Sequence, residues 1–175
     1  LQKVDSQLSF YAATKKSNEV MAHSYAHLFN IPTTMMRFFT AYGPWGRPDM
    51  ALFKFTKAIL SGEQIDLYNE GRMKRDFTFI EDLAEAIFLL LGESPNNSSP
   101  VLKDSISLVA PFRIVNIGNS QAVDLERFIS AIEKALGIRA KRNLVPMQQG
   151  DVPVSLANTD LLQELTGYVP NTSIE

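Results

Sequence analysis

The amino-acid sequence predicts an α/β protein, and three observations support that class. Segments with the apolar spacing of a helix alternate along the chain with short apolar or alternating segments typical of strands. Glycine and proline separate these segments at short intervals, as connections between packed elements require. The 175 residues are 45% hydrophobic and 21% charged, which is ordinary for a globular chain with a real core.

The first part of the chain predicts a helix, a buried strand, a loop and a second helix. Residues 10–29 carry apolar side chains at helical spacing and end shortly before a proline. Residues 33–39 begin with two threonines and continue with mostly apolar side chains, which favours a buried strand. Residues 43–48 contain two glycines and two prolines and predict a loop. Asp49 is the expected N-cap of a helix that ends near residue 60.

The middle of the chain repeats this alternation. Residues 65–68 predict a short strand and residues 69–71, Asn-Glu-Gly, predict a turn. Residues 75–80 alternate like a strand, and residues 81–91 predict a helix whose acidic first turn suits the helix dipole. Residues 94–111 begin with a stretch rich in Asn, Ser and Pro and predict a mobile surface loop.

The last part predicts two strands and two helices. Residues 113–117 form a short apolar strand pattern, and residues 124–136 form a helical pattern with an aspartate as the expected N-cap. Gly137 is the expected left-handed residue that closes this helix. Residues 139–145 predict a strand, and a final helix is expected from position 158 or 159 to about position 165.

Composition excludes several classes of function. The net charge of -2 provides no basic field for nucleic acid, and no apolar stretch is long enough to predict a membrane span or a signal peptide. The absence of cysteine removes disulfides and thiolate metal sites. His23 and His27 lie on one helix face without the glutamate of a metalloprotease motif, so a structural or interface role is expected and no metal site. A cytoplasmic protein fits these observations.

Tyr11 and Lys15 form the pair with the clearest chemical meaning. Residues four apart lie on one face of a helix, so the phenol and the ammonium group are expected to be neighbours. A positive charge near a phenol favours the phenolate form, which is how a tyrosine serves as a general base for an alcohol. The same spacing also occurs on ordinary surface helices, so the pair alone leaves both interpretations open.

Three further segments give the pair a context. Residues 37–50 read Arg-Phe-Phe-Thr-Ala-Tyr-Gly-Pro-Trp-Gly-Arg-Pro-Asp-Met, residues 74–80 read Lys-Arg-Asp-Phe-Thr-Phe-Ile, and residues 150–153 read Gly-Asp-Val-Pro. With the Tyr-x-x-x-Lys pair, these segments resemble the extended short-chain dehydrogenase/reductase family of NAD-dependent nucleotide-sugar epimerases and dehydratases, over nearly the whole chain. Residues 39–50 resemble in particular the UDP-glucuronate 4-epimerase branch of that family.

The resemblance implies a fold and an activity. The fold would be the C-terminal part of a Rossmann-like doubly wound sheet plus the smaller mixed α/β substrate-binding domain. Residues 1–48 would be the C-terminal portion of the NAD-binding Rossmann domain, with the catalytic helix and the following strand. Residues 49–175 would mainly form the nucleotide-sugar-binding domain, with some segments returning to the Rossmann domain. The implied reaction interconverts UDP-glucuronate and UDP-galacturonate through a 4-keto intermediate with bound NAD.

The resemblance also implies roles for individual residues near the cofactor. Tyr11 would take the proton from the sugar 4-hydroxyl, and Lys15 would support it and bind the nicotinamide ribose. Phe38 and Phe39 are expected in the core, with a backbone group, assigned to Phe38, near the nicotinamide.

Six residues are implied in substrate binding, each with a chemical reason. Two arginines suit the diphosphate, since a guanidinium fork matches phosphate oxygens. An aspartate and a tyrosine on one short strand would contact the uracil, a threonine would bind the sugar carboxylate, and an aspartate in the Gly-Asp-Val turn would bind ribose or sugar hydroxyls. The two arginines are Arg75 and Arg47. The strand residues are Asp66 and Tyr68, the threonine is Thr40, and the aspartate of the turn is Asp151.

The chain also departs from the family pattern. The Gly-rich turn that holds dinucleotide phosphates has no match here, and neither has the family's catalytic Ser or Thr, so a C-terminal piece without turnover of its own is expected. Two alternatives stay open: another NAD-dependent nucleotide-sugar epimerase, dehydratase or decarboxylase, or, for the isolated piece, a non-catalytic module that binds sugar nucleotides. The resemblance further implies a homodimer through the tyrosine-bearing helix, with Met21, His23 and Tyr25 as a candidate surface.

Overall fold

Five helices and seven strands alternate along the residues that the computed structural model describes, 6–95 and 104–175. The helices are α1 (Phe10–Phe29), α2 (Ala51–Leu60), α3 (Ile80–Leu90), α4 (Leu125–Leu136) and α5 (Asp160–Thr166). The strands are β1 (Thr33–Phe38), β2 (Thr40–Tyr42), β3 (Gln64–Leu67), β4 (Lys74–Phe79), β5 (Phe112–Ile117), β6 (Ala122–Asp124) and β7 (Lys141–Leu144). A 3-10 turn, η1 (Tyr68–Gly71), separates β3 from β4.

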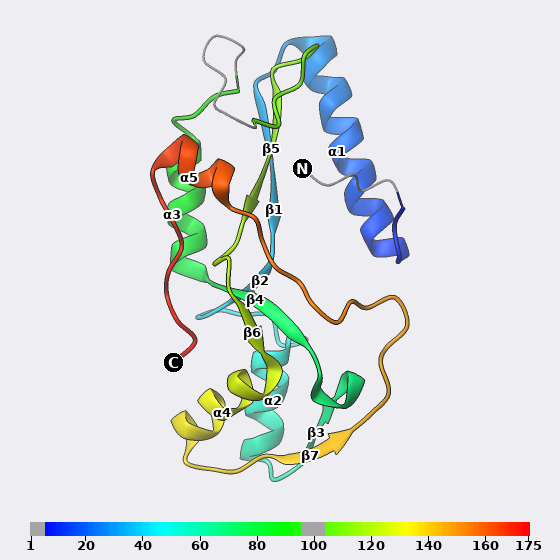
Figure 1. Ribbon diagram of the computed structural model, residues 1–175, viewed down its shortest axis with the longest axis vertical. Helices are drawn as coiled ribbons and strands as arrows, with labels where there is room; N and C mark the ends of the chain where they lie inside the picture. Colours follow the sequence, from blue (N-terminus) through cyan, green and yellow to red (C-terminus); the bar gives the residue numbers. More distant parts are fainter. Residues whose placement is uncertain (1–5, 96–103) are drawn as a thin grey trace.

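The parallel pair β1 and β5 forms the centre of one half of the molecule. Helix α1 covers one face of this pair, and α3 and α5 cover the other (Figure 1). Successive side chains of a strand point to opposite faces. Met35 therefore packs towards α1 with Ala26 and Phe112, whereas Met36 packs towards α3 and α5 with Leu83 and Leu162.

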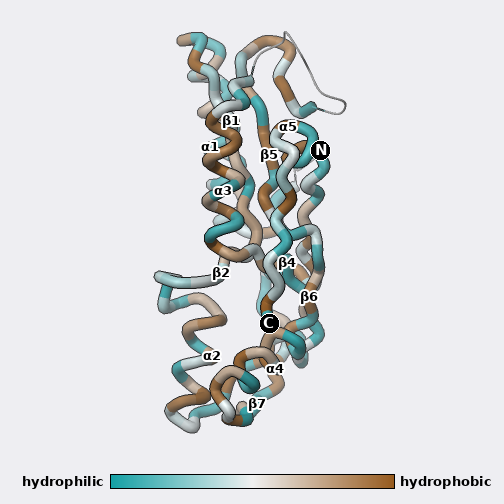
Figure 2. The backbone as a smooth tube through the Cα atoms, turned by 90° about the vertical axis from the view of Figure 1, so that its left-hand side faces the viewer, coloured by the Kyte–Doolittle hydropathy of each residue, from teal (hydrophilic) through white to brown (hydrophobic). Residues whose placement is uncertain are grey.

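A second half is built around a separate core. Helices α2 and α4 and the parallel pair β3 and β7 lie at the far end of the elongated molecule (Figure 2). Phe77 of β4 stacks on Phe128 of α4 with ring centroids 4.3 Å apart, and Ile65 and Ile129 are fully enclosed beside them. Strand β4 pairs in parallel with β2 and antiparallel with β6, so these three strands link the two halves.

Local chemistry explains several helix ends. The hydroxyl of Ser9 accepts a hydrogen bond from the backbone N–H of Ala12 and caps α1, at 3.2 Å. Gly137 closes α4 at φ 68°, which confirms the expected left-handed position, and Gly167 closes α5 at φ 69°. Among the helices of residues 6–95 and 104–175, none combines the length and apolar composition that crossing a bilayer requires.

The expected α/β class is confirmed, and every expected helix and strand is present. Two expectations about the fold were wrong. Met50, not Asp49, is the N-cap of α2, because the Asp49 carboxylate is engaged by Arg47. Phe38 is 49% exposed and lies outside the core. The two three-residue strands β2 and β6 were not predicted. The expected loop 94–111 lies partly outside the described residues, at positions 96–103.

Candidate active site

Tyr11 and Lys15 lie together on the first turns of α1. The Lys15 ammonium nitrogen is 5.3 Å from the centre of the Tyr11 ring, so the phenol and the positive charge are on the same side of the helix, as expected. The Tyr11 side chain is 70% exposed, which leaves its hydroxyl open to a ligand. Figure 1 shows that α1 runs antiparallel to β1 and begins level with the carboxyl end of that strand. In α/β proteins, ligands bind at this end of the sheet.

Residues 145–157, which we call the strap, connect the remaining parts of the candidate site. The strap begins beside η1, where Val145 exchanges backbone hydrogen bonds with Leu67 and Glu70 at 3.1 Å each. In its middle, a Cβ on Gly150 would lie 3.4 Å from the carbonyl oxygen of Leu8, immediately before α1. The strap therefore passes from the β3 region to the start of the helix that carries Tyr11.

Arg75 and Asp151 meet where the strap crosses β4. The Arg75 guanidinium donates to the Asp151 carboxylate at 2.8 Å and to the carbonyl oxygen of Val152 at 2.8 Å. The two charged side chains are 21% and 35% exposed, so the pair is partly shielded but open on one side. Arg75 and Asp151, which were assigned separately to substrate binding from the sequence, thus form one ion pair.

Arg47 lies on the loop that follows β2, near Tyr11. Its guanidinium pairs with Asp49 on the surface. That hydrogen bond, with a smaller contribution from the Tyr11 phenol, raises the pKa of Arg47. The loop starts at Gly43, where φ is 131° and a Cβ would lie 2.7 Å from the side chain of Ile80. Only glycine fits such a position, so the path of this loop depends on it.

Thr40 and Phe38 lie at the point where the chain passes from one sheet to the next. Phe38 is the last residue of β1 and pairs with Ile117 of β5. Thr40 is the first residue of β2 and pairs with Phe77 of β4. Phe38 is therefore at the carboxyl end of β1, and Thr40 is at the amino end of β2, with one residue between them.

Asp66 and Tyr68 lie beside the beginning of the strap, next to Val145. The Asp66 carboxylate accepts a hydrogen bond from the Asn143 side chain of β7 at 2.7 Å. Tyr68 is 42% exposed in η1. The candidate site therefore extends along the first half of the strap. Asp66 and Tyr68 lie beside its beginning, and Asp151, paired with Arg75, lies in its middle, where the strap passes the start of the helix that carries Tyr11 and Lys15.

Asp76, the neighbour of Arg75, was given no role from the sequence. Its carboxylate is fully buried and accepts backbone N–H groups of Asn119, Ser120 and Ala157 at 2.8, 3.0 and 2.9 Å. It thereby joins β4 to the turn after β5 and to the end of the strap. The only signal in the sequence was a carboxylate at the centre of an otherwise alternating strand.

The two histidines of α1 bind neighbouring protein groups. A ring nitrogen of His23 lies 2.8 Å from the Ser107 hydroxyl, and a ring nitrogen of His27 lies 2.6 Å from the Val109 carbonyl oxygen. His23 also packs edge-on against Phe112, so it faces the sheet and cannot belong to an outward helix surface with Met21, contrary to the expectation. Within residues 6–95 and 104–175, no group of three His, Asp or Glu side chains could hold a metal ion.

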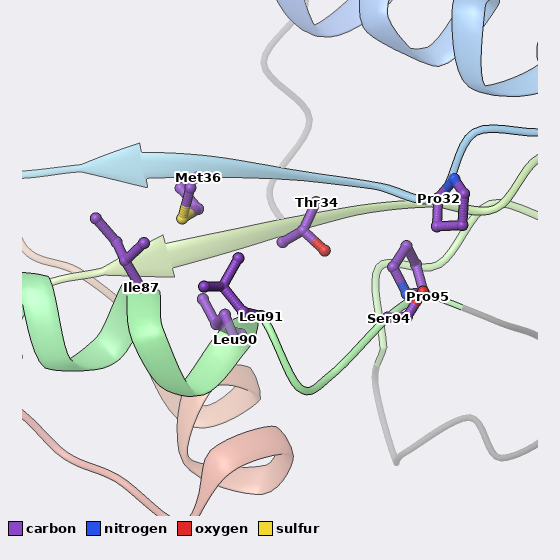
Figure 3. Close-up of a pocket in the computed structure, with 8 residues that line it drawn as sticks. All are labelled: Pro32, Thr34, Met36, Ile87, Leu90, Leu91, Ser94 and Pro95. Carbon is purple, nitrogen blue, oxygen red and sulfur yellow. The ribbon is translucent and has the colours of Figure 1, made fainter.

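A pocket of about 210 Å³ lies elsewhere, between β1 and α3. Figure 3 shows apolar side chains such as Met36, Ile87 and Leu90 around it. Pro32, at the amino end of β1, forms another wall. The lining contains no acidic or basic side chain, so this pocket has no groups for proton transfer.

The fold and the site define an α/β protein that places a tyrosine and a lysine at the carboxyl end of a parallel strand, beside an arginine. Residues 2–118 match the family model described as the NAD dependent epimerase/dehydratase family. The chain belongs to this family.

Individual relatives agree with that assignment. The chain is 55% identical to a probable UDP-glucuronate 4-epimerase of Rhizobium meliloti (strain 1021), over 99% of the chain and 52% of that protein. It is 41% identical to UDP-glucuronate 4-epimerase 4 of Arabidopsis thaliana, over 99% of the chain and 40% of that protein. The chain therefore spans about half the length, or less, of these relatives.

Solved structures show the same fold. The UDP-glucuronic acid 4-epimerase of Bacillus cereus, in complex with UDP-glucuronic acid and NAD, superposes with a TM-score of 0.81 at 30% identity, over 95% of this chain and 49% of that one. A second structure, MoeE5 in complex with UDP-glucuronic acid and NAD, gives a TM-score of 0.81 at 27% identity, over 99% of this chain and 54% of that one. Both support the Rossmann-like α/β class expected from the sequence.

Proposed function

We propose that the full-length protein interconverts UDP-glucuronate and UDP-galacturonate, with NAD as cofactor. One observation carries this proposal: the exposed Tyr11 phenol lies beside the Lys15 ammonium group at the start of α1, where the strap brings Arg75 and Asp151 near. A base for a hydroxyl group and a guanidinium for a diphosphate are the two groups that such a reaction needs at neighbouring positions. Relatives with the printed name UDP-glucuronate 4-epimerase support the choice of sugar.

In the proposed reaction, Tyr11 takes the proton from the sugar 4-hydroxyl and later returns it. Lys15 stabilises the phenolate by its charge and binds the nicotinamide ribose. NAD, when bound, would supply the redox chemistry at C4 of the sugar, as the hydride acceptor and then as the hydride donor to the opposite face. The exposed phenol and the half-exposed Phe38 at the end of β1 leave room for a dinucleotide on this side, and a backbone group of Phe38 would contact the nicotinamide. General-base catalysis of this kind contributes about 10²- to 10⁴-fold.

The proposed substrate extends along the strap. Arg75 and Arg47 bind the diphosphate, since each guanidinium carries donors that fit phosphate oxygens. The Asp151 carboxylate accepts hydrogen bonds from ribose or sugar hydroxyls, and Thr40 donates to the sugar carboxylate. Asp66 and Tyr68 contact the uracil at the far end.

The proposal includes an assembly and a division into domains. Helix α1 exposes the apolar side chains of Val20, Met21, Tyr25 and Leu28, each more than half accessible. Such a surface suits a homodimer formed through α1. Residues 1–48 are assigned to the NAD-binding domain and residues 49–175 mainly to the substrate-binding domain. The protein is proposed to act in the cytoplasm.

The test is an epimerase assay of the full-length protein with each of the two UDP-uronates. Tyr11→Phe removes only the hydroxyl that acts as base, so we expect kcat to fall by about 10²- to 10⁴-fold. Tyr25→Phe is the matched control, because Tyr25 is an equally exposed tyrosine on the same helix, 62% against 70% accessible. A wild-type protein that forms neither UDP-uronate from the other would refute the proposal, and parallel assays with other nucleotide sugars would then identify a different substrate.

A further inference from the structure

The buried Glu19 of α1 and Arg37 of β1 have no place in the proposed reaction, yet they join the helix that carries Tyr11 to the sheet. Resting on the proposed function, we infer that this ion pair is a positioning clamp that sets the height of Tyr11 and Lys15 against the carboxyl end of β1. Neither residue would touch the substrate. Their effect on catalysis would act through the position of the helix.

The contacts are those of a paired fork. The Arg37 guanidinium donates through Nε to Oε1 of Glu19 at 2.5 Å and through a terminal nitrogen to Oε2 at 2.8 Å. Lys16 adds a third donor at 3.2 Å. Glu19 is only 8% exposed, in a helix whose other fully buried residue is Ala26. Two parallel charge-assisted bonds fix both distance and angle, which a single lysine contact cannot do.

The surroundings keep the pair ionic. The hydrogen bond from Arg37 outweighs burial and holds the pKa of Glu19 below its ordinary value, and Lys16 acts in the same direction. The carboxylate is therefore charged at neutral pH. Breaking one side of such a pair would leave an uncompensated charge in a shielded place, so the helix is held to one arrangement.

The rise per residue of a helix and of a strand shows which residues the clamp brings to the same level. Tyr11 lies eight residues before Glu19, which is about 12 Å along a helix that rises 1.5 Å per residue. The same distance along a strand corresponds to roughly three to four residues at about 3.3 Å each. Since α1 and β1 run antiparallel (Figure 1), Tyr11 is level with the stretch just beyond β1, where Thr40 begins β2.

Among the hydrogen bonds that α1 side chains make to other described segments, those of the clamp lie nearest to the proposed catalytic pair. Within the described residues, the other hydrogen bonds from α1 side chains to segments outside the helix come from His23 and His27. His23 and His27 lie about one and two helical turns further from Tyr11 than Glu19 does, and both bind the segment 104–111. If the clamp were loosened, the first two turns of α1 would be free to tilt against the sheet while the remainder of the helix stayed in place.

The test compares Arg37→Lys with Arg113→Lys in the full-length protein. Arg113 is the matched control, because it makes the same two-bond fork to Asp104, at 3.0 and 2.8 Å, and is even more buried. It lies on the partner strand β5, level with Thr34 and thus away from the carboxyl end. Lysine keeps the charge in both variants and loses the fork.

We expect Arg37→Lys to lower kcat by about ten- to a hundredfold, as small displacements of a catalytic group do, with KM for the UDP-sugar changed less than about twofold. Amide hydrogen exchange over residues 10–18 should become faster in Arg37→Lys and stay unchanged in Arg113→Lys. Arg113→Lys should lower thermal stability and leave kcat unchanged. Glu19→Gln keeps the shape of the side chain and removes its charge, so it should show the same fall in kcat and the same faster exchange. It replaces Arg37→Lys in the test if that variant folds poorly.

Equal kcat for Arg37→Lys, Glu19→Gln and the wild type would overturn the inference, and so would an equal loss in Arg37→Lys and Arg113→Lys. A wild-type protein without epimerase activity would instead remove the proposed function. The exchange measurement would then still decide whether the ion pair holds the first turns of α1.

Discussion

Asp76→Asn is the substitution whose cost can be worked out most directly from the structure. In the parent protein, Oδ1 of Asp76 accepts the N–H of Asn119, and Oδ2 accepts those of Ser120 and Ala157. All three donors are backbone groups, which cannot reverse their direction. An asparagine has one acceptor oxygen and one NH2 group, so at best it keeps the two bonds at Oδ2 and turns a donor towards the N–H of Asn119.

The expected loss follows from these bonds. A hydrogen bond to a charged group contributes about 1.5–3 kcal/mol to stability. A buried donor that is left without a partner costs about 1–3 kcal/mol more. With the side chain fully enclosed, we expect Asp76→Asn to reduce the free energy of unfolding by about 3 kcal/mol or more. The volume and shape of the side chain hardly change, so packing contributes little.

Asp82→Asn provides a control with the same pattern of bonds. One oxygen of Asp82 accepts the N–H groups of Asn171 and Thr172, and the other accepts the Thr172 hydroxyl. That hydroxyl can rotate and accept a bond from the new NH2 group. Because Asp82 is also only half-buried, its replacement should cost about 1 kcal/mol or less.

Urea unfolding of the two variants and the parent measures the difference. A midpoint for Asp76→Asn well below that for Asp82→Asn, at equal slopes, is the expected result. Equal midpoints for the two variants would show that the direction of the donors does not decide the cost, and would refute the reasoning. A change of slope would indicate an altered unfolded or native state and would call for hydrogen exchange at Asn119 to resolve it.

Three further outcomes follow from the contacts. Gly118→Ala should reduce the free energy of unfolding by about 1–3 kcal/mol, since the new Cβ would lie 2.4 Å from the Cβ of Ala157. Gly92→Ala is the control: its Cβ would meet only a carbonyl oxygen, at 3.4 Å, so the same urea titration should show almost no change. Arg75→Lys should weaken UDP binding about tenfold in calorimetry, because the fork is lost while the charge remains. The hydrogen bond from Arg37 lowers the pKa of Glu19 and so adds stability that is fully present above pH 4.5 and is lost as the pH falls through the folded value, so acid unfolding curves of Glu19→Gln should be flatter in that range.

Local patterns predicted most of the secondary structure. The helix expected at residues 10–29 is α1 with the same bounds, and the glycine at 137 closes α4 in the left-handed conformation. Helical spacing and a terminal glycine are properties of neighbouring residues, so the sequence contains them directly. The Tyr11 and Lys15 pair is of the same kind, because a four-residue spacing on a helix determines its own geometry.

What the patterns missed depends on partners far along the chain. Strands β2 and β6 have three residues each and exist through pairing with β4, and three residues are too few to show a period. Asp49 carries a typical N-cap side chain, but Arg47 competes for its carboxylate. Glu19 and Asp76 look like ordinary surface charges until the fold brings Arg37 or three amide groups to them.

The start of β4 shows why the candidate site and the stability of the fold share one short segment. Lys74 exchanges backbone bonds with the strap, its N–H donating to Pro153 at 2.8 Å and its carbonyl accepting from Ser155 at 3.1 Å. The next two side chains point to opposite faces of the strand, yet both reach the strap, which therefore crosses the edge of β4 at Lys74. Arg75 stays partly exposed and open to a ligand, whereas Asp76 is sealed and holds only protein groups. Changes at Arg75 should accordingly alter binding more than stability, and changes at Asp76 should do the reverse, although one peptide bond separates them.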